Sequence, residues 1–340
     1  MRLAINGFGR IGRCRLRALY ESPLRGSLSV VAINEPADLE SMAYLVRFDS
    51  THGRFPGSVA VQGEQLLING DAIAVSHATR PVDVHRAALG VDLVMECSGQ
   101  YASRGELGRF LDAGCPRVMV SHPANSAADV DATVVMGVNQ AALRGPERLV
   151  SSASCTTNAI VPVLAALDRH FGIELASMTT LHSVMNDQPL IDGYHHADLR
   201  RTRSAMQSMV PVSTGLVRGV ERLLPELAGR LQAKAIRVPV ANVSAIDLAV
   251  TLARDATAAE INLRLEEAAR DELVGLLDCS ASPHASVDFN HNPHSAIVDS
   301  GLTRVAGTRL ADLLVWFDNE WGFANRMLEV AACWQRRLGH

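Results

Sequence analysis

The first half of the chain alternates short apolar runs with polar, glycine-containing segments. These runs have the length and continuous apolar character of buried parallel strands, and they lie at residues 2–5, 28–33, 91–97, 117–121 and 133–139. Helices are predicted between them, at residues 13–20 and 104–113. Residues 66–93 are predicted as short strands and turns, with a hairpin that turns at Asn69-Gly70. This alternation predicts an open parallel sheet, doubly wound with helices on both faces.

The pattern changes after residue 155. A helix from residue 159 leads to a strand at 174–182 and then to a long polar segment, 183–209, without clear periodicity. Loops of this length are usually functional or form interfaces. Further strands are predicted at 234–240, 243–252, 286–289, 295–299 and 311–317, and helices at 258–270 and 320–338. The second half is therefore expected to be an α+β domain with a mostly antiparallel sheet and helices on one face.

A glycine-rich turn follows the first predicted strand. It carries the pattern G-x-G-x-x-G at Gly7, Gly9 and Gly12, with Arg10 and Ile11 between the last two. In dinucleotide-binding turns the three glycines allow the tight turn, the approach of a pyrophosphate and close helix packing, in that order. The pyrophosphate would lie at the helix N-terminus. The turn predicts a Rossmann-type domain, with all five residues at its cofactor site.

The second predicted strand ends at Glu35, about 20 residues after the last glycine, where an acidic residue binds the adenosine ribose hydroxyls. A carboxylate there repels a 2′-phosphate, so NAD is favoured over NADP. The alternative for Glu35 is a solvated loop carboxylate. Ligands bind parallel sheets at the carboxyl ends of strands, so Ser98, Gly99 and Ser121 are expected on the cofactor rim.

Composition narrows the class of protein. The chain has 340 residues, 48% hydrophobic and 20% charged, with a formal net charge of −4, which argues against nucleic acid or an acidic membrane held by bulk charge. No apolar run approaches the roughly 18 residues of a membrane span, and no signal-like segment opens the chain, so a cytoplasmic protein is expected. The six cysteines form no C-x-x-C pair, which favours reduced thiols over disulfides or zinc.

Cys155 is the candidate nucleophile. It lies between a strand-like run and an apolar helical segment, with Ser154 and Thr156 beside it. Helix-start N–H groups favour a thiolate, and the short hydroxyls can hold an anion. A lone cysteine is more often a small buried hydrophobe. An adjacent imidazolium would strengthen the nucleophilic interpretation, because it lowers a thiol pKa and serves as acid or base. His182, taken alone, is more often a surface or core histidine.

Several motifs occur together in one order along the chain. They are G-x-G-x-x-G, S-C-T-T-N at 154–158, His182, R-R-T-R at 200–203, S-T-G at 213–215, R-V-P at 237–239 and W-F-D-N-E-W-G at 316–322. This order resembles the glyceraldehyde-3-phosphate dehydrogenase family over essentially the whole chain. Segments 49–55, 198–203 and 290–295 resemble most closely its bacterial erythrose-4-phosphate dehydrogenase branch.

The resemblance implies an NAD-dependent oxidation of a phosphorylated aldose. Cys155 would form a thiohemiacetal and then a thioester, with His182 as its acid and base. Asn319 would bind the nicotinamide carboxamide. Two anion sites, for the substrate phosphate and for the attacking group, would be lined by Ser154, Thr156, Arg201, Thr214, Gly215 and Arg237.

Two departures leave the substrate open. Met185 stands where glyceraldehyde enzymes usually carry a threonine of a phosphate site, as in the erythrose branch, whereas Ser213-Thr214-Gly215 is more similar to the glyceraldehyde enzymes. Oxidation of erythrose 4-phosphate with hydrolysis of the thioester, in pyridoxal phosphate synthesis, is the preferred prediction. The alternatives are phosphorylating oxidation of glyceraldehyde 3-phosphate in glycolysis and, from another class, a non-catalytic NAD-binding sensor.

The resemblance also implies the domain organisation. Residues 1–154, completed by 319–340, are expected to bind NAD, and residues 155–318 are expected to form the catalytic domain. The 183–209 segment resembles the family's interface loop, which predicts a homotetramer. His284, His291 and His294 lie near Cys279, but the family uses this segment without a metal, so no metal is expected.

Overall fold

The chain divides into two compact units, each with its own sheet. The computed structural model describes residues 1–80, 83–84, 89–196 and 198–339. One unit comprises Met1–Ser154 with Ala324–His340, and the other comprises Cys155–Phe323. Residues 81–82 and 85–88 of the predicted strand-and-turn segment, and residue 197 of the polar segment, lie outside the described residues.

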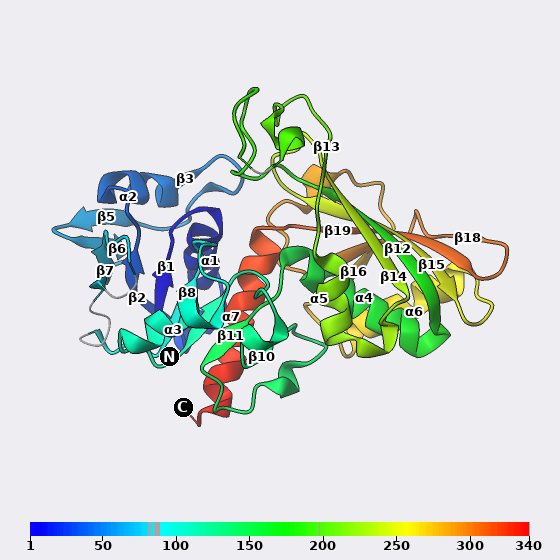
Figure 1. Ribbon diagram of the computed structural model, residues 1–340, viewed down its shortest axis with the longest axis horizontal. Helices are drawn as coiled ribbons and strands as arrows, with labels where there is room; N and C mark the ends of the chain where they lie inside the picture. The colour runs from blue at the N-terminus through cyan, green and yellow to red at the C-terminus, as the bar shows by residue number, and fades with distance from the viewer. Residues whose placement is uncertain (81–82, 85–88, 197, 340) are drawn as a thin grey trace. The chain divides into compact units, whose positions relative to one another are not determined.

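The described residues of the first unit form a nine-stranded sheet (Figure 1). Its order is β10 (Ala132–Thr133), β11 (Leu149–Ser151), β9 (Val118–Val120), β8 (Leu93–Glu96), β1 (Arg2–Asn6), β2 (Ser29–Asn34), β7 (Asp71–Ser76), β6 (Gln65–Ile68) and β5 (Val59–Gln62). Neighbours from β10 to β7 pair in parallel, and β7, β6 and β5 form an antiparallel edge.

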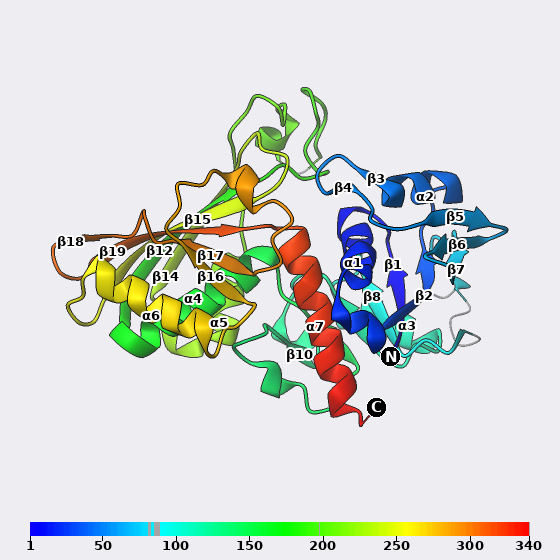
Figure 2. The same cartoon turned by 180° about the vertical axis from the view of Figure 1, so that it is seen from behind.

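Helices cover both faces of this sheet. They are α1 (Arg10–Tyr20), α2 (Leu39–Arg47), α3 (Arg104–Asp112) and the part of α7 (Trp321–Arg337) from residue 324 onward. Figures 1 and 2 show α3 on one face and α1 with α7 on the other. The central strand β8 is buried at every position, because side chains on both of its faces lie under helices. The predicted doubly wound parallel sheet is confirmed.

The predicted hairpin turn is confirmed as well. Asn69 and Gly70, between β6 and β7, have φ angles of +52° and +89°. A two-residue hairpin turn that matches the twist of its strands needs positive φ at both central positions, and Asn-Gly adopts it at low cost.

The strand predicted at 133–139 is largely wrong, since β10 ends at Thr133 and the Val134 N–H makes the next bond to β11, to the Ser151 carbonyl at 2.8 Å. Beyond it the Asn139 side chain takes the backbone partners that a neighbouring strand would supply. Its Oδ1 accepts from the Val135 N–H at 2.8 Å, and its Nδ2 donates to the Thr133 carbonyl at 2.8 Å. The apolar run is thus buried as a turn at the sheet edge.

The described residues of the second unit form an eight-stranded sheet. Its order is β13 (Val210–Val212), β14 (Leu231–Arg237), β12 (Ile173–His182), β15 (Ser244–Leu252), β19 (Leu310–Phe317), β17 (Ala296–Asp299) and β16 (Leu277–Ser280), with β18 (Arg304–Ala306) also paired to β19. The β12–β14 and β16–β17 pairs are parallel and the others antiparallel, which confirms the predicted mostly antiparallel sheet.

Helices α4 (Cys155–Phe171), α5 (Leu216–Leu223) and α6 (Ala258–Arg270) lie on one face of this sheet, as Figure 2 shows. Burial alternates along β12, with Ala176 and Met178 inside and Leu175 and Ser177 exposed. This alternation is what a sheet with one covered face produces.

The strand predicted at 286–289 is wrong. Ser286–Phe289 is a 3₁₀ turn, in which the Asp288 carboxylate accepts from the Ala285 N–H at 2.8 Å. Phe289 is buried by stacking on Trp316, with ring centroids 5.7 Å apart. Four residues are too few for periodicity to distinguish a strand from a single turn.

Candidate active site

The glycine-rich turn of the first unit leaves open space at one glycine only. Gly7 has φ +85°, and a methyl group there would lie 2.6 Å from Ser98 N. A methyl group on Gly12 would lie 2.3 Å from Gly7 O, so both positions need glycine for the fold itself. At Gly9 a methyl group would meet nothing within 4 Å. The turn therefore keeps backbone exposed at Gly9, where an external group can approach.

Helix α1 begins at this turn without a side-chain cap and without an acidic residue in its first turn. The first backbone N–H groups of α1, from Arg10, Ile11 and Gly12 onward, can therefore donate hydrogen bonds to a bound anion. The Arg10 guanidinium itself donates to Asp49 at 2.5 Å. Burial would raise the Asp49 pKa, but this contact and backbone N–H groups hold it at about 2. Arg10 consequently offers a ligand its backbone rather than its side chain.

The predicted rim residues lie at the carboxyl ends of strands β2, β8 and β9, with β1 between β2 and β8. Glu35 follows β2 and accepts from the Phe8 N–H at 2.7 Å. Ser98 and Gly99 follow β8, and Ser121 follows β9, where its N–H donates to Glu96 O at 3.0 Å. A carboxylate, a glycine turn and a helix start without a side-chain cap on one edge fit a dinucleotide.

Sequence reasoning missed Glu96, which is fully buried at the same edge. Its carboxylate accepts from Asn6 Nδ2 and from the Ser98 N–H, each at 2.6 Å, and burial raises its pKa. Asn34 Nδ2 donates in turn to Asn6 Oδ1 at 3.0 Å. The signal in the sequence that could have found Glu96 is that three neighbouring strands each end in a polar residue: Asn6, Asn34 and Glu96.

In the second unit Cys155 is the first residue of α4, two positions after Ala153, whose φ is +56°. Its Sγ lies 3.7 Å from His182 Nε2 and 3.9 Å from Thr156 Oγ1. His182 is the last residue of β12, and its Nδ1 lies 2.8 Å from the Ser183 carbonyl. That carbonyl can only accept, so the ring proton is on Nδ1 and Nε2 faces the thiol as a base.

The predicted lowering of the Cys155 pKa is not found. Desolvation by the surrounding protein raises the pKa of the thiol, and contacts with Thr156 and the charge of Arg237 offset this only in part. Desolvation also lowers the pKa of His182, and Arg237 lowers it further. Desolvation thus opposes the charged form of both the thiol and the imidazole.

The two predicted phosphate-binding arginines converge on one carboxylate. Arg237 is the last residue of β14 and pairs in register with His182. Its Nη1 donates to Asp187 Oδ1 at 3.0 Å, and Arg201 Nη1 donates to Asp187 Oδ2 at 2.9 Å. The Asp187 pKa is lowered: burial opposes ionisation, but the charges of both arginines outweigh it. The sequence prediction gave Asp187 no role.

The other predicted substrate residues are placed less closely together. Gly215 precedes α5 as its N-cap, and Thr214 Oγ1 accepts from the Leu216 N–H at 3.2 Å. In the described part of the chain Thr214 shares no hydrogen bond with Arg201. Ser154 is the last residue of the first unit, next to Cys155 in the chain.

Asn319 lies between β19 and α7 and is 7% exposed. Its neighbour Asp318 caps α7, because Asp318 Oδ1 accepts from the N–H groups of Glu320 and Trp321 at 2.9 and 2.7 Å. This cap fixes the backbone conformation at Asn319.

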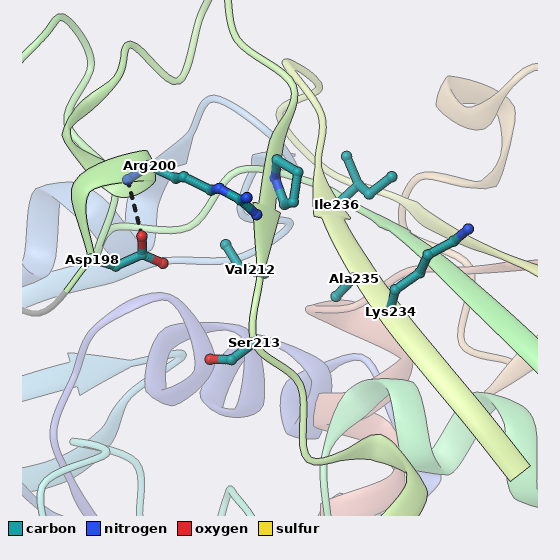
Figure 3. Close-up of a pocket in the computed structure, with 8 residues that line it drawn as sticks. Asp198, Arg200, Val212, Ser213, Lys234, Ala235 and Ile236 are labelled. Carbon is teal, nitrogen blue, oxygen red and sulfur yellow. Dashed lines mark hydrogen bonds between the residues drawn. The ribbon is translucent and has the colours of Figure 1, made fainter.

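A separate cavity of about 520 Å³ lies at the β13–β14 edge of the second unit (Figure 3). Its lining residues are Asp198, Arg200, Pro211, Val212, Ser213, Lys234, Ala235 and Ile236. Cys155, His182 and Arg237 are not among them, so this cavity is not the place where the thiol acts.

The candidate metal-binding histidines have other partners. The His291 ring stacks on Trp321, with centroids 3.6 Å apart. His294 Nδ1 lies 2.9 Å from Asn292 Oδ1. Among the helices that the structure describes, none combines the length and the apolar character that crossing a membrane requires.

A dinucleotide-type rim in one unit and a thiol–imidazole pair beside arginines in the other define the class of nicotinamide-dependent dehydrogenases that act on aldehydes. A family model described as the glyceraldehyde 3-phosphate dehydrogenase NAD binding domain matches residues 1–104. A second, described as the C-terminal domain of that enzyme, matches residues 154–319. The chain belongs to the glyceraldehyde-3-phosphate dehydrogenase family. It is an NAD-dependent oxidoreductase that acts on the aldehyde group of a sugar phosphate.

Proposed function

We propose that the chain oxidises D-erythrose 4-phosphate to 4-phosphoerythronate and releases the acid by hydrolysis. Cys155 and His182 are the catalytic residues in this proposal. Residues 1–154 with the C-terminal helix carry the cofactor, and residues 155–318 carry the chemistry.

The oxidation begins at the thiol. As Cys155 Sγ bonds to the aldehyde carbon, His182 Nε2 takes the thiol proton and passes it to the new hydroxyl group. NAD, when bound, accepts the hydride from this thiohemiacetal carbon. His182 removes the hydroxyl proton as the carbonyl of the thioester forms, and it then releases this proton to solvent. The neutral imidazole can next take a proton from the water that attacks the thioester carbon and give it to the Cys155 sulfur as the acid departs.

The choice of hydrolysis depends on the pairing of Asp187 with both arginines. The carboxylate neutralises part of the charge that a free phosphate ion would need, and Met185, half exposed beside it, cannot donate to phosphate. A phosphate carried by the sugar is less affected, since the thiohemiacetal tethers it at a high effective concentration. This organisation supports hydrolysis. The role in pyridoxal phosphate synthesis is proposed from the resemblance to the erythrose branch.

Phosphorylating oxidation of glyceraldehyde 3-phosphate is the second candidate. Thr214, next to the start of α5, keeps a hydroxyl on a phosphate-compatible loop, which favours it. A non-catalytic NAD sensor is less consistent with the 3.7 Å Cys155–His182 pair.

The deciding experiment measures initial rates with each sugar phosphate, with and without inorganic phosphate, and identifies the products. We expect a higher kcat/KM with erythrose 4-phosphate, the free acid as product and little dependence on phosphate. A rate that collapses without phosphate and yields an acyl phosphate would establish the second candidate. Cys155→Ala should abolish turnover and keep NAD binding, whereas retained turnover would exclude the covalent route.

We also propose a homotetramer that works in the cytoplasm. Cys97, Cys155, Cys279 and Cys333 are free thiols, which suits a reducing compartment. The 183–209 segment exposes a group of large apolar side chains, which suits an interface between subunits.

A further inference from the structure

The amide of Asn319 is held at one end by two buried hydroxyl groups. Asn319 Oδ1 accepts from Ser183 Oγ at 2.9 Å and from Ser244 Oγ at 2.8 Å. Ser183 has no exposed surface and Ser244 is 2% exposed. The structure gives Asn319 Nδ2 no hydrogen-bond partner among the described residues. A nine-tenths buried side chain thus has a saturated carbonyl end and an unused N–H donor end.

The strands of the second unit create this arrangement. Ser183 directly follows β12, and Ser244 begins the adjacent strand β15. The Ser183 N–H donates to Ser244 Oγ at 3.1 Å. Because Ser244 Oγ accepts from the Ser183 N–H, its hydroxyl proton points to a different atom, Asn319 Oδ1. The hydroxyl pair therefore selects the carbonyl end of the amide and turns the NH₂ group away from itself.

Ser183 also connects this amide to the reactive pair. Its carbonyl accepts from His182 Nδ1 at 2.8 Å and so fixes the tautomer with Nε2 toward Cys155. Its hydroxyl holds Asn319 at 2.9 Å. One residue thereby sets the orientation of both the base and the amide donor.

We propose that Ser183 and Ser244 are positioning residues for the cofactor: they fix the Asn319 amide so that its NH₂ is offered to the carboxamide oxygen of NAD. This inference rests on the proposed role of Asn319. A fixed donor holds the nicotinamide ring in one orientation, which determines the ring face that receives the hydride. Without the serines the amide can rotate, and the carbonyl end repels the carboxamide oxygen.

The test compares two ligands of the full-length protein, NAD and ADP-ribose, which lacks the nicotinamide. In the Ser183→Ala, Ser244→Ala double variant we expect the Kd for NAD to rise about tenfold, the effect of losing a typical hydrogen bond, and the Kd for ADP-ribose to stay unchanged. An unchanged Kd for NAD, or an equal loss for both ligands, would overturn the proposal. Ser295→Ala, which removes another buried hydroxyl group of the same unit, is the control.

A double-mutant cycle shows whether the serines act through Asn319. In an Asn319→Ala background, Ser244→Ala should not weaken NAD binding further. Additive losses would show that Ser244 acts by another route. These measurements need no turnover, so they stand if the sugar substrate is another one; inactivity of the unaltered protein toward both sugar phosphates would overturn the proposed function alone.

Discussion

Asp187 is a single carboxylate shared by two guanidinium groups. Its two oxygens lie 3.0 Å from Arg237 Nη1 and 2.9 Å from Arg201 Nη1. Because Arg237 lies opposite His182 across the β12–β14 pair, the same carboxylate influences the imidazole. It raises the His182 pKa, against burial and Arg237, which lower it. The charge of Asp187 thus affects both the binding of phosphate by the two arginines and the pKa of His182, the general base.

Replacing Asp187 by Asn should change both properties in predictable directions. With less negative charge, inorganic phosphate should compete with the sugar phosphate about fivefold more tightly, as expected for a partly exposed charge. The His182 pKa, already below its usual 6.5, should fall further, so the base stays neutral to lower pH and the acidic limb of kcat/KM against pH moves to lower pH.

The control is Asp192→Asn, since Asp192 pairs with Arg203 in the same loop at 3.1 Å but both side chains are exposed. It should move neither the phosphate inhibition constant nor the pH profile. A shift of the acidic limb to higher pH in Asp187→Asn would contradict the electrostatic account.

At the scale of the element, the glycines that the β1–α1 turn needs for folding differ from the glycine that it needs for ligand binding. Gly7 and Gly12 are required by contacts within the protein, whereas Gly9 has empty space where a side chain would be. The N-terminus of α1 lacks an acidic or capping side chain, which leaves its N–H groups for an anion.

Gly9→Ala should therefore weaken NAD binding about tenfold or more, a loss of about 1.4 kcal/mol or more, because the methyl group occupies the path of the pyrophosphate. The free energy of unfolding should change by less than about 1 kcal/mol, measured by denaturant titration. Gly108→Ala on α3, where a methyl group also meets nothing within 4 Å, should leave NAD binding intact. Unaltered affinity in Gly9→Ala would place the pyrophosphate elsewhere.

At the scale of the whole molecule, the 183–209 segment exposes several large apolar side chains. Ile191 is 73% exposed, and the Tyr194 side chain is fully exposed. Apolar side chains gathered in one loop usually mark a contact with another protein surface, and here that surface belongs to further copies in the proposed tetramer.

Light scattering should give the mass of four chains, and Ile191→Asp should lower it, because a buried unpaired carboxylate is costly at an interface. Val274→Asp, at an exposed apolar residue elsewhere in the same unit, should keep the tetramer. A stable monomer of the unaltered protein at working concentration would contradict the tetramer.

The sequence by itself determined the features that depend on local chemistry. The glycine spacing, the Asn69-Gly70 turn and the apolar runs of the parallel strands were recognisable because backbone geometry and periodicity act over a few residues. Local chemistry also made Cys155 a candidate, whereas His182 was identified by the resemblance of the motif order to a family; the Cys155 Sγ and His182 Nε2 atoms lie 3.7 Å apart.

Only the tertiary structure decided the features that depend on distant residues. The pairing of β12 with β14 puts His182 beside Arg237, 55 positions later in the numbering, and the path of the polar segment brings Asp187 between two arginines. Burial decided the direction of the Cys155 pKa, because helix-start chemistry is local whereas desolvation depends on everything packed around the thiol. The same reason explains why the strands predicted at 133–139 and 286–289 are wrong. In the first segment the Asn139 side chain bonds to the backbone in place of a neighbouring strand, and in the second Phe289 is buried against the Trp316 ring.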